Sequence, residues 1–194
     1  ACNHPMARGR AAGPMNGIFV TAELDGPLGD RVRTIQERWD PKLARELPPH
    51  VTLIGSSGAG PIAPDTPVDA LRAAIEPVTR ATPPLDLTFG PPQRFIGREI
   101  VVLPLTPHGP LRALHEGLKA SGIRYETARW PFTPHATLNF YATLTSESLP
   151  ALLAVREPGP WRLHTLRVYH TRDGAKPRLL FNAPLGGGAG APGR

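Results

Sequence analysis

The feature that most constrains the fold of this chain is a pentapeptide that occurs twice. Pro49-His50-Val51-Thr52-Leu53 returns as Pro134-His135-Ala136-Thr137-Leu138. A composition with 7 His and 25 Pro predicts on the order of 0.01 chance matches to the pattern Pro-His-x-Thr-Leu in the whole chain. The two copies therefore indicate an internal duplication, and the fold has to accommodate two related halves.

Both motifs lie in strand-like surroundings. His50 begins the run His-Val-Thr-Leu-Ile-Gly, and His135 begins His-Ala-Thr-Leu-Asn-Phe-Tyr. Side chains at i and i+2 point to the same face of a strand, so each motif presents an imidazole beside a hydroxyl, from Thr52 and Thr137. The residues between them point the opposite way, into a core. Two such strands facing one cleft would place two imidazoles and two hydroxyls around one small volume.

The two halves match beyond the motifs. In each half, a strand leads through Gly-Pro-Leu into a helix, then the motif strand, a second helix and an alternating strand. The expected strands are 18–24, 50–55, 85–89, 94–96, 100–105 and 135–141, the expected helices are 28–39, 67–80, 111–118 and 146–155, and a hairpin joins 161–169 to 178–185. This pattern predicts an α+β fold, a bilobal pseudo-twofold duplication with two largely antiparallel sheets, flanking helices and a central active-site groove.

The length of 194 residues suits a single domain made of two closely packed lobes. We assign this bilobal domain to 17–185, with repeats at about 17–90 and 100–170 and the C-terminal hairpin extending to 185. The Gly-, Ala-, Arg- and Pro-rich residues 1–16 are expected to form a flexible tail, and the Gly-rich residues 186–194 a disordered one.

Composition limits the classes of function. The single cysteine, Cys2, excludes an internal disulfide and a structural zinc site with Cys ligands. No apolar run of signal-peptide length precedes Gly17 and none approaches a membrane span, so we expect a monomeric cytoplasmic protein with no membrane partner. The net charge of +6 favours polyanionic partners, but the basic residues are scattered and form no extended nucleic-acid track.

Paired imidazoles suit general acid–base catalysis, because an ordinary pKa near 6.5 allows one ring to be neutral while the other is protonated. Cleavage of a phosphodiester requires both states, and Thr hydroxyls can donate hydrogen bonds to its non-bridging oxygens. The chain has no Gly-x-Ser-x-Gly, no P-loop, and no carboxylate recurring beside the motifs to complete a metal site. Two hypotheses remain, a metal-independent phosphodiesterase and a non-catalytic nucleotide- or RNA-binding module that uses the same groove.

The motifs His50-Val-Thr-Leu and Phe132-Thr-Pro-His135-Ala-Thr-Leu resemble those of the two-histidine phosphoesterase superfamily, in particular its 2′-5′ RNA ligase and RNA 2′,3′-cyclic phosphodiesterase branch. The resemblance extends from about Gly17 to Leu185. It implies an enzyme without metal or other cofactor that opens RNA 2′,3′-cyclic phosphates to 2′-phosphates, with water attacking and the 3′-oxygen leaving. The implied partners are RNA ends or nucleotides with a 2′,3′-cyclic phosphate. ATP-independent 2′-5′ RNA ligation, the reverse reaction, remains an alternative.

The same resemblance implies roles for the motif residues. His50 and His135 would be catalytic, with His135 favoured as the base and His50 as the acid, although the sequence does not distinguish the two assignments. Thr52 and Thr137 would bind the phosphate.

Two further residues, Arg129 and Phe132, lie where the family contacts the phosphate or the base of a nucleotide. Arg can pair with phosphate and an aromatic ring can stack on an unpaired base. The structural alternatives are a solvated loop charge for Arg129 and a core side chain for Phe132. After the first motif the chain has Ile54-Gly55-Ser56-Ser57, where the family carries an aromatic residue and Leu-Gly, which leaves the subfamily and the substrate open.

Overall fold

The structure is a computed structural model that describes residues 15–105, 109–157 and 159–187. Its helices are α1 (Gly26–Trp39), α2 (Pro41–Glu46), α3 (Val68–Ala81), α4 (Gly109–Lys119) and α5 (Ser148–Leu153). Its strands are β1 (Asn16–Glu23), β2 (His50–Ile54), β3 (Leu85–Leu87), β4 (Gln93–Arg94), β5 (Val101–Pro104), β6 (His135–Asn139), β7 (Trp161–Leu163), β8 (Thr165–Arg172) and β9 (Arg178–Pro184), followed by a 3₁₀ turn, η1 (Leu185–Gly187). Within these ranges, no helix combines the length and the apolar character needed to cross a membrane.

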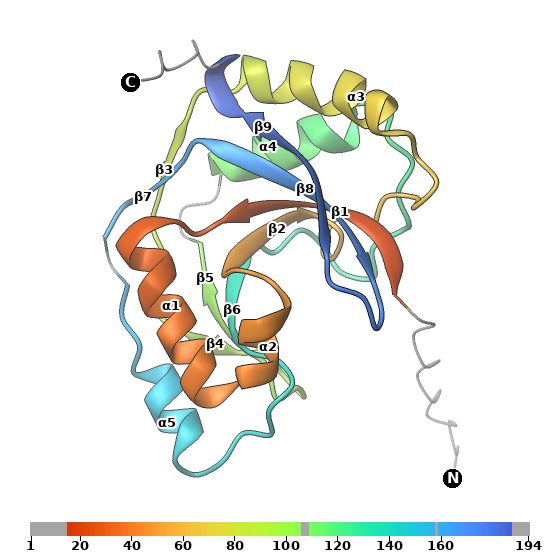
Figure 1. The fold of residues 1–194 in the computed structure, drawn as a ribbon. Coiled ribbons are helices and arrows are strands. Elements are labelled where there is room, and N and C mark those ends of the chain that lie inside the picture. Colours follow the sequence, from red (N-terminus) through yellow and green to blue (C-terminus); the bar gives the residue numbers. More distant parts are fainter. Residues whose placement is uncertain (1–14, 106–108, 158, 188–194) are drawn as a thin grey trace, which may run out of the picture.

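Seven of the strands form one sheet in the order β4-β5-β6-β2-β1-β8-β9, and β3 pairs with β7 in a separate two-stranded sheet. The named strands pair in antiparallel fashion throughout. Figure 1 shows α3 and α4 beside β9 in the upper part of the view, and α1, α2 and α5 in the lower left part. The predicted α+β class with antiparallel sheets and helices is therefore confirmed.

The two halves build their motif strands in the same way. In the first half, His50 lies opposite Glu23, and the register between β1 and β2 shifts beyond Thr21. In the second half, His135 lies opposite Pro104, and the register between β5 and β6 shifts beyond Val102. Each motif strand thus pairs with the first strand of its own half and carries an irregularity at the equivalent place.

The halves are not separate sheets, which corrects the expected division of strands. The motif strands β2 and β6 pair with each other at Val51 and Ala136, so one sheet runs through both halves. In addition, β8 of the second half pairs with β1 of the first, and β4, which lies between the two repeats, forms a hairpin with β5 of the second. The small sheet joins β3 and β7 in the same manner. Each half therefore completes the other.

One face of the motif strands is packed in the core. Val51, Leu53, Ala136 and Leu138 are each 0% exposed, as expected for the residues that alternate with the His and Thr positions. The helix α1 lies against β6, and α4 lies against β2. The first helix of each half thus covers the motif strand of the other half, which leaves the His and Thr side chains on the opposite face of the sheet.

The C-terminal hairpin differs from the prediction. It consists of β8 and β9, because the chain leaves the pairing of β7 with β3 before Thr165 and only then begins the long strand beside β1. The predicted helix end at Pro41 is followed directly by α2. There the Oδ1 atom of Asp40 accepts a hydrogen bond from the backbone N–H of Leu43 at 3.2 Å, and Pro41 occupies the first helical position, where it requires no hydrogen bond.

The ends of the ordered domain also extend beyond the predicted 17–185. β1 begins at Asn16, because the backbone N–H of Met15 donates to Asp173 Oδ2 at 2.6 Å and the N–H of Asp173 donates to the carbonyl of Met15 at 2.8 Å. At the other end, η1 includes Gly186. The remaining predicted tails, 1–14 with Cys2 and 188–194, lie outside the described residues.

Candidate active site

The four motif side chains line one open cavity of about 320 Å³. The pairing of Val51 with Ala136, continued by one residue in each direction along antiparallel strands, places His50 opposite Thr137 and Thr52 opposite His135. On one face of a sheet, directly opposite residues lie about 5 Å apart and diagonal ones about 7–8 Å apart. The two imidazoles therefore occupy one diagonal of a small quadrilateral and the two hydroxyls the other.

Each imidazole is oriented by a carbonyl two residues earlier in the chain. His50 Nδ1 lies 2.8 Å from the carbonyl oxygen of Pro48, and His135 Nδ1 lies 2.7 Å from that of Thr133. Because a carbonyl oxygen only accepts hydrogen bonds, Nδ1 of each ring must carry the proton. The Nε2 atom of each ring is thereby left to accept or donate a proton.

The environment favours the neutral form of both rings. Burial lowers the pKa of His50 below its ordinary value of 6.5, against the opposing effect of the hydrogen bond with Pro48. Burial also lowers the pKa of His135, which the bond with Thr133 opposes and the positive charge of a protonated His50 reinforces. An edge-on contact with Phe95, with 5.2 Å between ring centroids, covers part of His135. The effect of a protonated His50 on the pKa of His135 is that of a second positive charge nearby, as expected for two rings that line the same cavity.

The opposite half of the chain also supports each motif strand. From α1, the Nε2 atom of Gln36 donates a hydrogen bond to the backbone carbonyl of Thr137 at 2.8 Å, and the residue lines the cavity. From α4, Nδ1 of the buried His115 bonds with the backbone carbonyl of Leu53 at 2.7 Å. The sequence did not indicate this role for Gln36 or His115, because a polar residue on the apolar side of a helix does not show which strand it will contact.

A pair of exposed aromatic residues forms another part of the cavity wall. Phe140 and Tyr141, directly after β6, are 49% and 43% exposed and meet edge to face, with 4.8 Å between ring centroids. The hydroxyl of Tyr141 donates to Glu46 at 2.7 Å, and burial together with this bond raises the pKa of that hydroxyl. The sequence offered one signal for this part of the cavity: two adjacent aromatic residues at the end of a strand point to opposite faces, so both cannot be buried in the same core.

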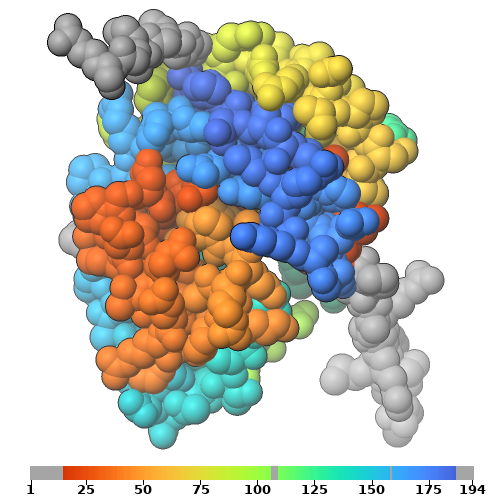
Figure 2. Space-filling model, viewed as in Figure 1, coloured from red at the N-terminus to blue at the C-terminus, as the bar shows by residue number. Residues whose placement is uncertain are grey.

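The turn between β8 and β9 completes the rim of the cavity. Residues 172–175 and Pro177 of this turn line the cavity, and Figure 2 shows the turn, in blue, projecting beside α2, in orange. Sequence reasoning identified the hairpin but gave it no part in the site, since nothing local indicates which strand of the other half it adjoins.

Neither residue predicted to contact the nucleotide reaches this cavity. Phe132 is 4% exposed and stacks on the ring of His115, with 3.8 Å between centroids, so it occupies the core position that was its structural alternative. Arg129 is exposed and lies over Trp130, 5.1 Å from the ring centroid. The backbone between Arg129 and His135 carries both residues away from the four motif side chains.

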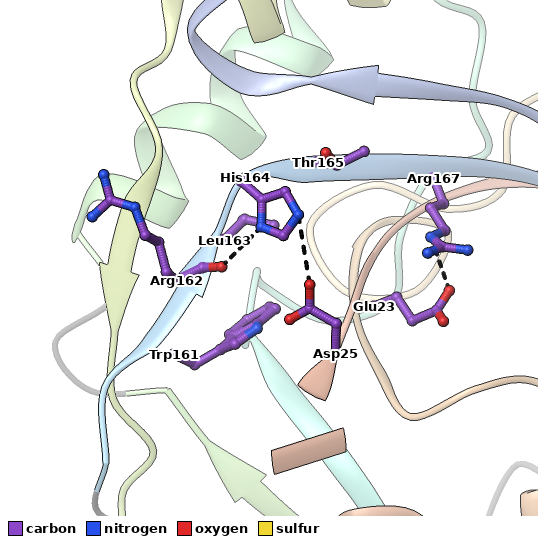
Figure 3. Close-up of a pocket in the computed structure, with 8 residues that line it drawn as sticks. All are labelled: Glu23, Asp25, Trp161, Arg162, Leu163, His164, Thr165 and Arg167. Carbon is purple, nitrogen blue, oxygen red and sulfur yellow. Dashed lines mark hydrogen bonds and ion pairs between the residues drawn. The ribbon is translucent and has the colours of Figure 1, made fainter. Parts of the chain in front are cut away.

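A second hollow, drawn in Figure 3, lies away from the motifs. Its volume of about 20 Å³ is sufficient for roughly one water molecule. His164 Nε2 lies 3.5 Å from a carboxylate oxygen of Asp25, and Arg167 lies 3.0 Å from Glu23, so these four side chains form two pairs. In the part of the chain that the structure describes, no three His, Cys, Asp or Glu side chains are grouped so as to hold a metal ion.

An antiparallel α+β fold with two His-x-Thr strands lining one cavity defines the class of the two-histidine phosphoesterases. The sequence profile of the 2′-5′ RNA ligase superfamily matches residues 24–175, and the chain therefore belongs to this superfamily. Among curated protein sequences, none matches the chain.

Solved structures with the same fold include two bacterial proteins. TT0787 of Thermus thermophilus is 19% identical and superposes with a TM-score of 0.67, over 89% of this chain and 99% of that one. Escherichia coli LigT, in complex with phosphate, is 17% identical with a TM-score of 0.57, over 89% of this chain and 98% of LigT. A structure described as a phosphoesterase is 18% identical, with a TM-score of 0.55, over 88% of this chain and 98% of its own.

Proposed function

We propose that the protein is a metal-independent phosphodiesterase that opens RNA 2′,3′-cyclic phosphates to 2′-phosphates. The observation that carries this proposal is the diagonal arrangement of His50 and His135 in one cavity, each with Nδ1 engaged by a carbonyl and Nε2 left for proton transfer. A separation of about 7–8 Å between diagonal positions of the two strands leaves room for a phosphate group between their side chains. The superfamily supports the same reaction class.

In the proposed reaction, a water oxygen attacks phosphorus while Nε2 of His135 accepts its proton. The bond from phosphorus to the 3′-oxygen breaks, and Nε2 of His50, protonated beforehand, donates a proton to that oxygen. The product is a 2′-phosphate with a free 3′-hydroxyl, and proton exchange with solvent restores both rings. Each proton transfer contributes about 10²–10⁴-fold to the rate.

The hydroxyls of Thr52 and Thr137 would stabilise the charge that develops on the non-bridging oxygens. In the described part of the chain neither hydroxyl has a recorded hydrogen-bond partner, so both can donate to the phosphate. The negative charge of the phosphate raises the pKa of a neighbouring imidazole, which favours the protonated acid when substrate is bound.

The cavity also suits a nucleotide. Its volume of about 320 Å³ falls in the range for small-molecule sites, roughly 300–1,000 Å³. A base could stack on Phe140, whereas Lys42 already lies over the ring of Tyr141, 3.9 Å from its centroid. Escherichia coli LigT has been solved with 3′-AMP, at a TM-score of 0.51 to this chain.

A second candidate is ligation of a 2′,3′-cyclic phosphate end to a 5′-hydroxyl, which the description of the superfamily as 2′-5′ RNA ligases supports. This reaction is not the reverse of the hydrolysis, contrary to the expectation from the sequence. The 5′-hydroxyl would take the place of water as the nucleophile and the 3′-oxygen would again leave, so base and acid would keep the same roles.

The test is turnover of a nucleoside 2′,3′-cyclic phosphate in the presence of EDTA, with the product identified as the 2′- or 3′-phosphate. His50→Ala and His135→Ala should each abolish turnover while a nucleoside 2′-phosphate still binds. His164→Ala is the matched control, since His164 is exposed in the separate hollow of Figure 3 and should retain full activity. A binding module would bind the nucleotide without turnover in the unsubstituted protein, and persistent turnover in both variants would overturn the proposed mechanism.

A further inference from the structure

The hairpin of β8 and β9 carries a further hollow, distinct from that of Figure 3, next to the candidate active site. Its volume is about 290 Å³, and it is lined by His170, Arg172, Ala175, Lys176 and Arg178. Four of these five side chains carry or can acquire a positive charge. A hollow with this lining is suited to an anion.

This basic hollow and the active-site cavity share a wall. Arg172 and Ala175 line both, and Pro177, which lines the active-site cavity, lies between Lys176 and Arg178 of the basic hollow. The two sites therefore lie on either side of one short turn. The turn that separates them is the one that projects beside α2 in Figure 2.

The cations of the hollow have no carboxylate partner among the described residues. Arg172, Lys176 and Arg178 are exposed and take part in none of the ion pairs found there. The one acidic residue of the turn, Asp173, already accepts the backbone N–H of Met15 at 2.6 Å. Three exposed cations against one engaged carboxylate leave a local excess of positive charge.

The hollow is held in place by β1. His170 pairs through Nε2 with the side-chain oxygen of Asn16 at 2.9 Å, and Met15 exchanges two hydrogen bonds with Asp173. Burial, followed by the charges of Arg172 and Arg178, lowers the pKa of His170, so the positive charge of the hollow comes mainly from Arg172, Lys176 and Arg178. The cationic side chains thus extend from a fixed backbone, so that less freedom is lost when an anion binds.

We propose that the basic hollow binds a phosphodiester group of the RNA strand whose 3′ end lies between His50 and His135. The inference rests on the proposed function, because a 2′,3′-cyclic phosphate is a 3′ end and all other phosphates of that strand lie on its 5′ side. A cyclic mononucleotide would fill only the active-site cavity. An oligonucleotide would fill both sites, and the enzyme should prefer it.

The test compares a cyclic mononucleotide with a tetranucleotide that ends in a 2′,3′-cyclic phosphate. Lys176→Gln and Arg178→Gln should each lower kcat/KM for the tetranucleotide about 2- to 5-fold, as expected for an exposed charge pair. Their effect should appear in KM, and kcat/KM for the mononucleotide should not change. The slope of log KM against log salt should fall by about 0.7 for each lost phosphate contact.

Two variants serve as controls. Arg80→Gln removes the same charge from the C-terminal turn of α3, beside η1 at the end of β9 that lies away from the turn of the hairpin, and should affect neither substrate. Arg178→Lys keeps the charge and should retain most of the preference for the tetranucleotide. An equal effect of Lys176→Gln and Arg80→Gln would show that only the net charge of the protein matters, and it would overturn the inference.

Direct binding separates this inference from the proposed reaction. The affinity of a fluorescent tetranucleotide with a 3′-phosphate, measured by anisotropy, should fall about 10-fold in the double variant of Lys176 and Arg178, whether or not the protein turns over cyclic phosphates. If the unsubstituted protein shows no turnover but still binds the tetranucleotide more tightly than the double variant does, only the proposed reaction is overturned. Equal affinity of the double variant and the unsubstituted protein would overturn the basic hollow as an RNA site.

Discussion

Asp40 joins the end of α1 to the aromatic wall of the active site through backbone hydrogen bonds. The residue is 1% exposed, and its Oδ2 atom accepts from the backbone N–H groups of Phe140 and Tyr141, both at 2.7 Å, and of Ala142 at 3.4 Å. Its Oδ1 atom caps α2 through Leu43. One carboxylate thus fixes α2 and the segment after β6, which lie on the same side of the cavity.

The magnitude of an Asp40→Asn substitution follows from these bonds. A hydrogen bond to a charged group contributes about 1.5–3 kcal/mol and a neutral one about 0.5–1.5, so loss of the charge costs about 1 kcal/mol for each of the two short bonds. The new amide NH₂ must also face a backbone N–H that was satisfied before, which costs about 1–2 kcal/mol more. We expect the free energy of unfolding to fall by about 3 kcal/mol, and KM for a cyclic nucleotide to rise because the Phe140–Tyr141 segment loosens.

Urea unfolding with linear extrapolation, followed by tryptophan fluorescence, measures this change. Asp30→Asn is the matched control, because Asp30 is exposed on α1 and should change the free energy of unfolding by no more than about 0.5 kcal/mol. Equal stability of the two variants would show that water satisfies the N–H groups of the segment, and the assignment of Asp40 as the organiser of this wall would be refuted.

Three other predictions concern titration and packing. Because the pKa values of His50 and His135 both lie below 6.5, the bell-shaped profile of kcat/KM should peak below pH 6.5, and a peak above pH 7 would contradict these shifts. Because burial lowers the pKa of His115 in the folded protein, the unfolded chain binds more protons than the folded one just below pH 6.5. The free energy of unfolding should therefore decrease as the pH falls through this range, and it should decrease less steeply in His115→Gln. Urea titrations at several pH values measure both slopes. Gly58→Ala should lower that free energy by about 2 kcal/mol more than Gly174→Ala, because both glycines have positive φ but only at Gly58 would the new methyl clash with the ring of His115.

The parts of the fold that the sequence predicted are those fixed by local pattern. The motif strands at His50 and His135 were placed correctly, because alternation in a β-branched run and the preceding prolines act within a few residues. The helices were placed for the same reason, since apolar spacing identifies α1, α3 and α4 without reference to the rest of the chain.

The parts that the sequence did not predict depend on contacts between distant segments. The pairing of β8 with β1, and that of β3 with β7, joins segments that are far apart in the chain and that no local pattern connects. Phe132 and Arg129 were expected near the substrate from the resemblance to the family, whereas neither lines the cavity: Phe132 packs on His115 and Arg129 lies over Trp130. The aromatic wall and the basic turn come from the ends of strands whose neighbours were unknown.

The exchange of strands and helices between the halves explains why a duplicated motif can provide two different catalytic roles. An antiparallel pair centred on Val51 and Ala136 sets His50 beside Thr137 and His135 beside Thr52, so each imidazole would act with the hydroxyl of the other half. The two environments still differ, since Phe95 contacts only His135 among the aromatic contacts found and Gln36 supports the strand of His135. Equivalent backbones with unequal surroundings are what the proposed acid and base need, because the symmetry would direct both rings at one phosphorus while different surroundings give each ring its own influences on the pKa. Removal of the Phe95 ring, for example in Phe95→Ala, should therefore alter the pH profile of kcat/KM more than the affinity for a nucleotide.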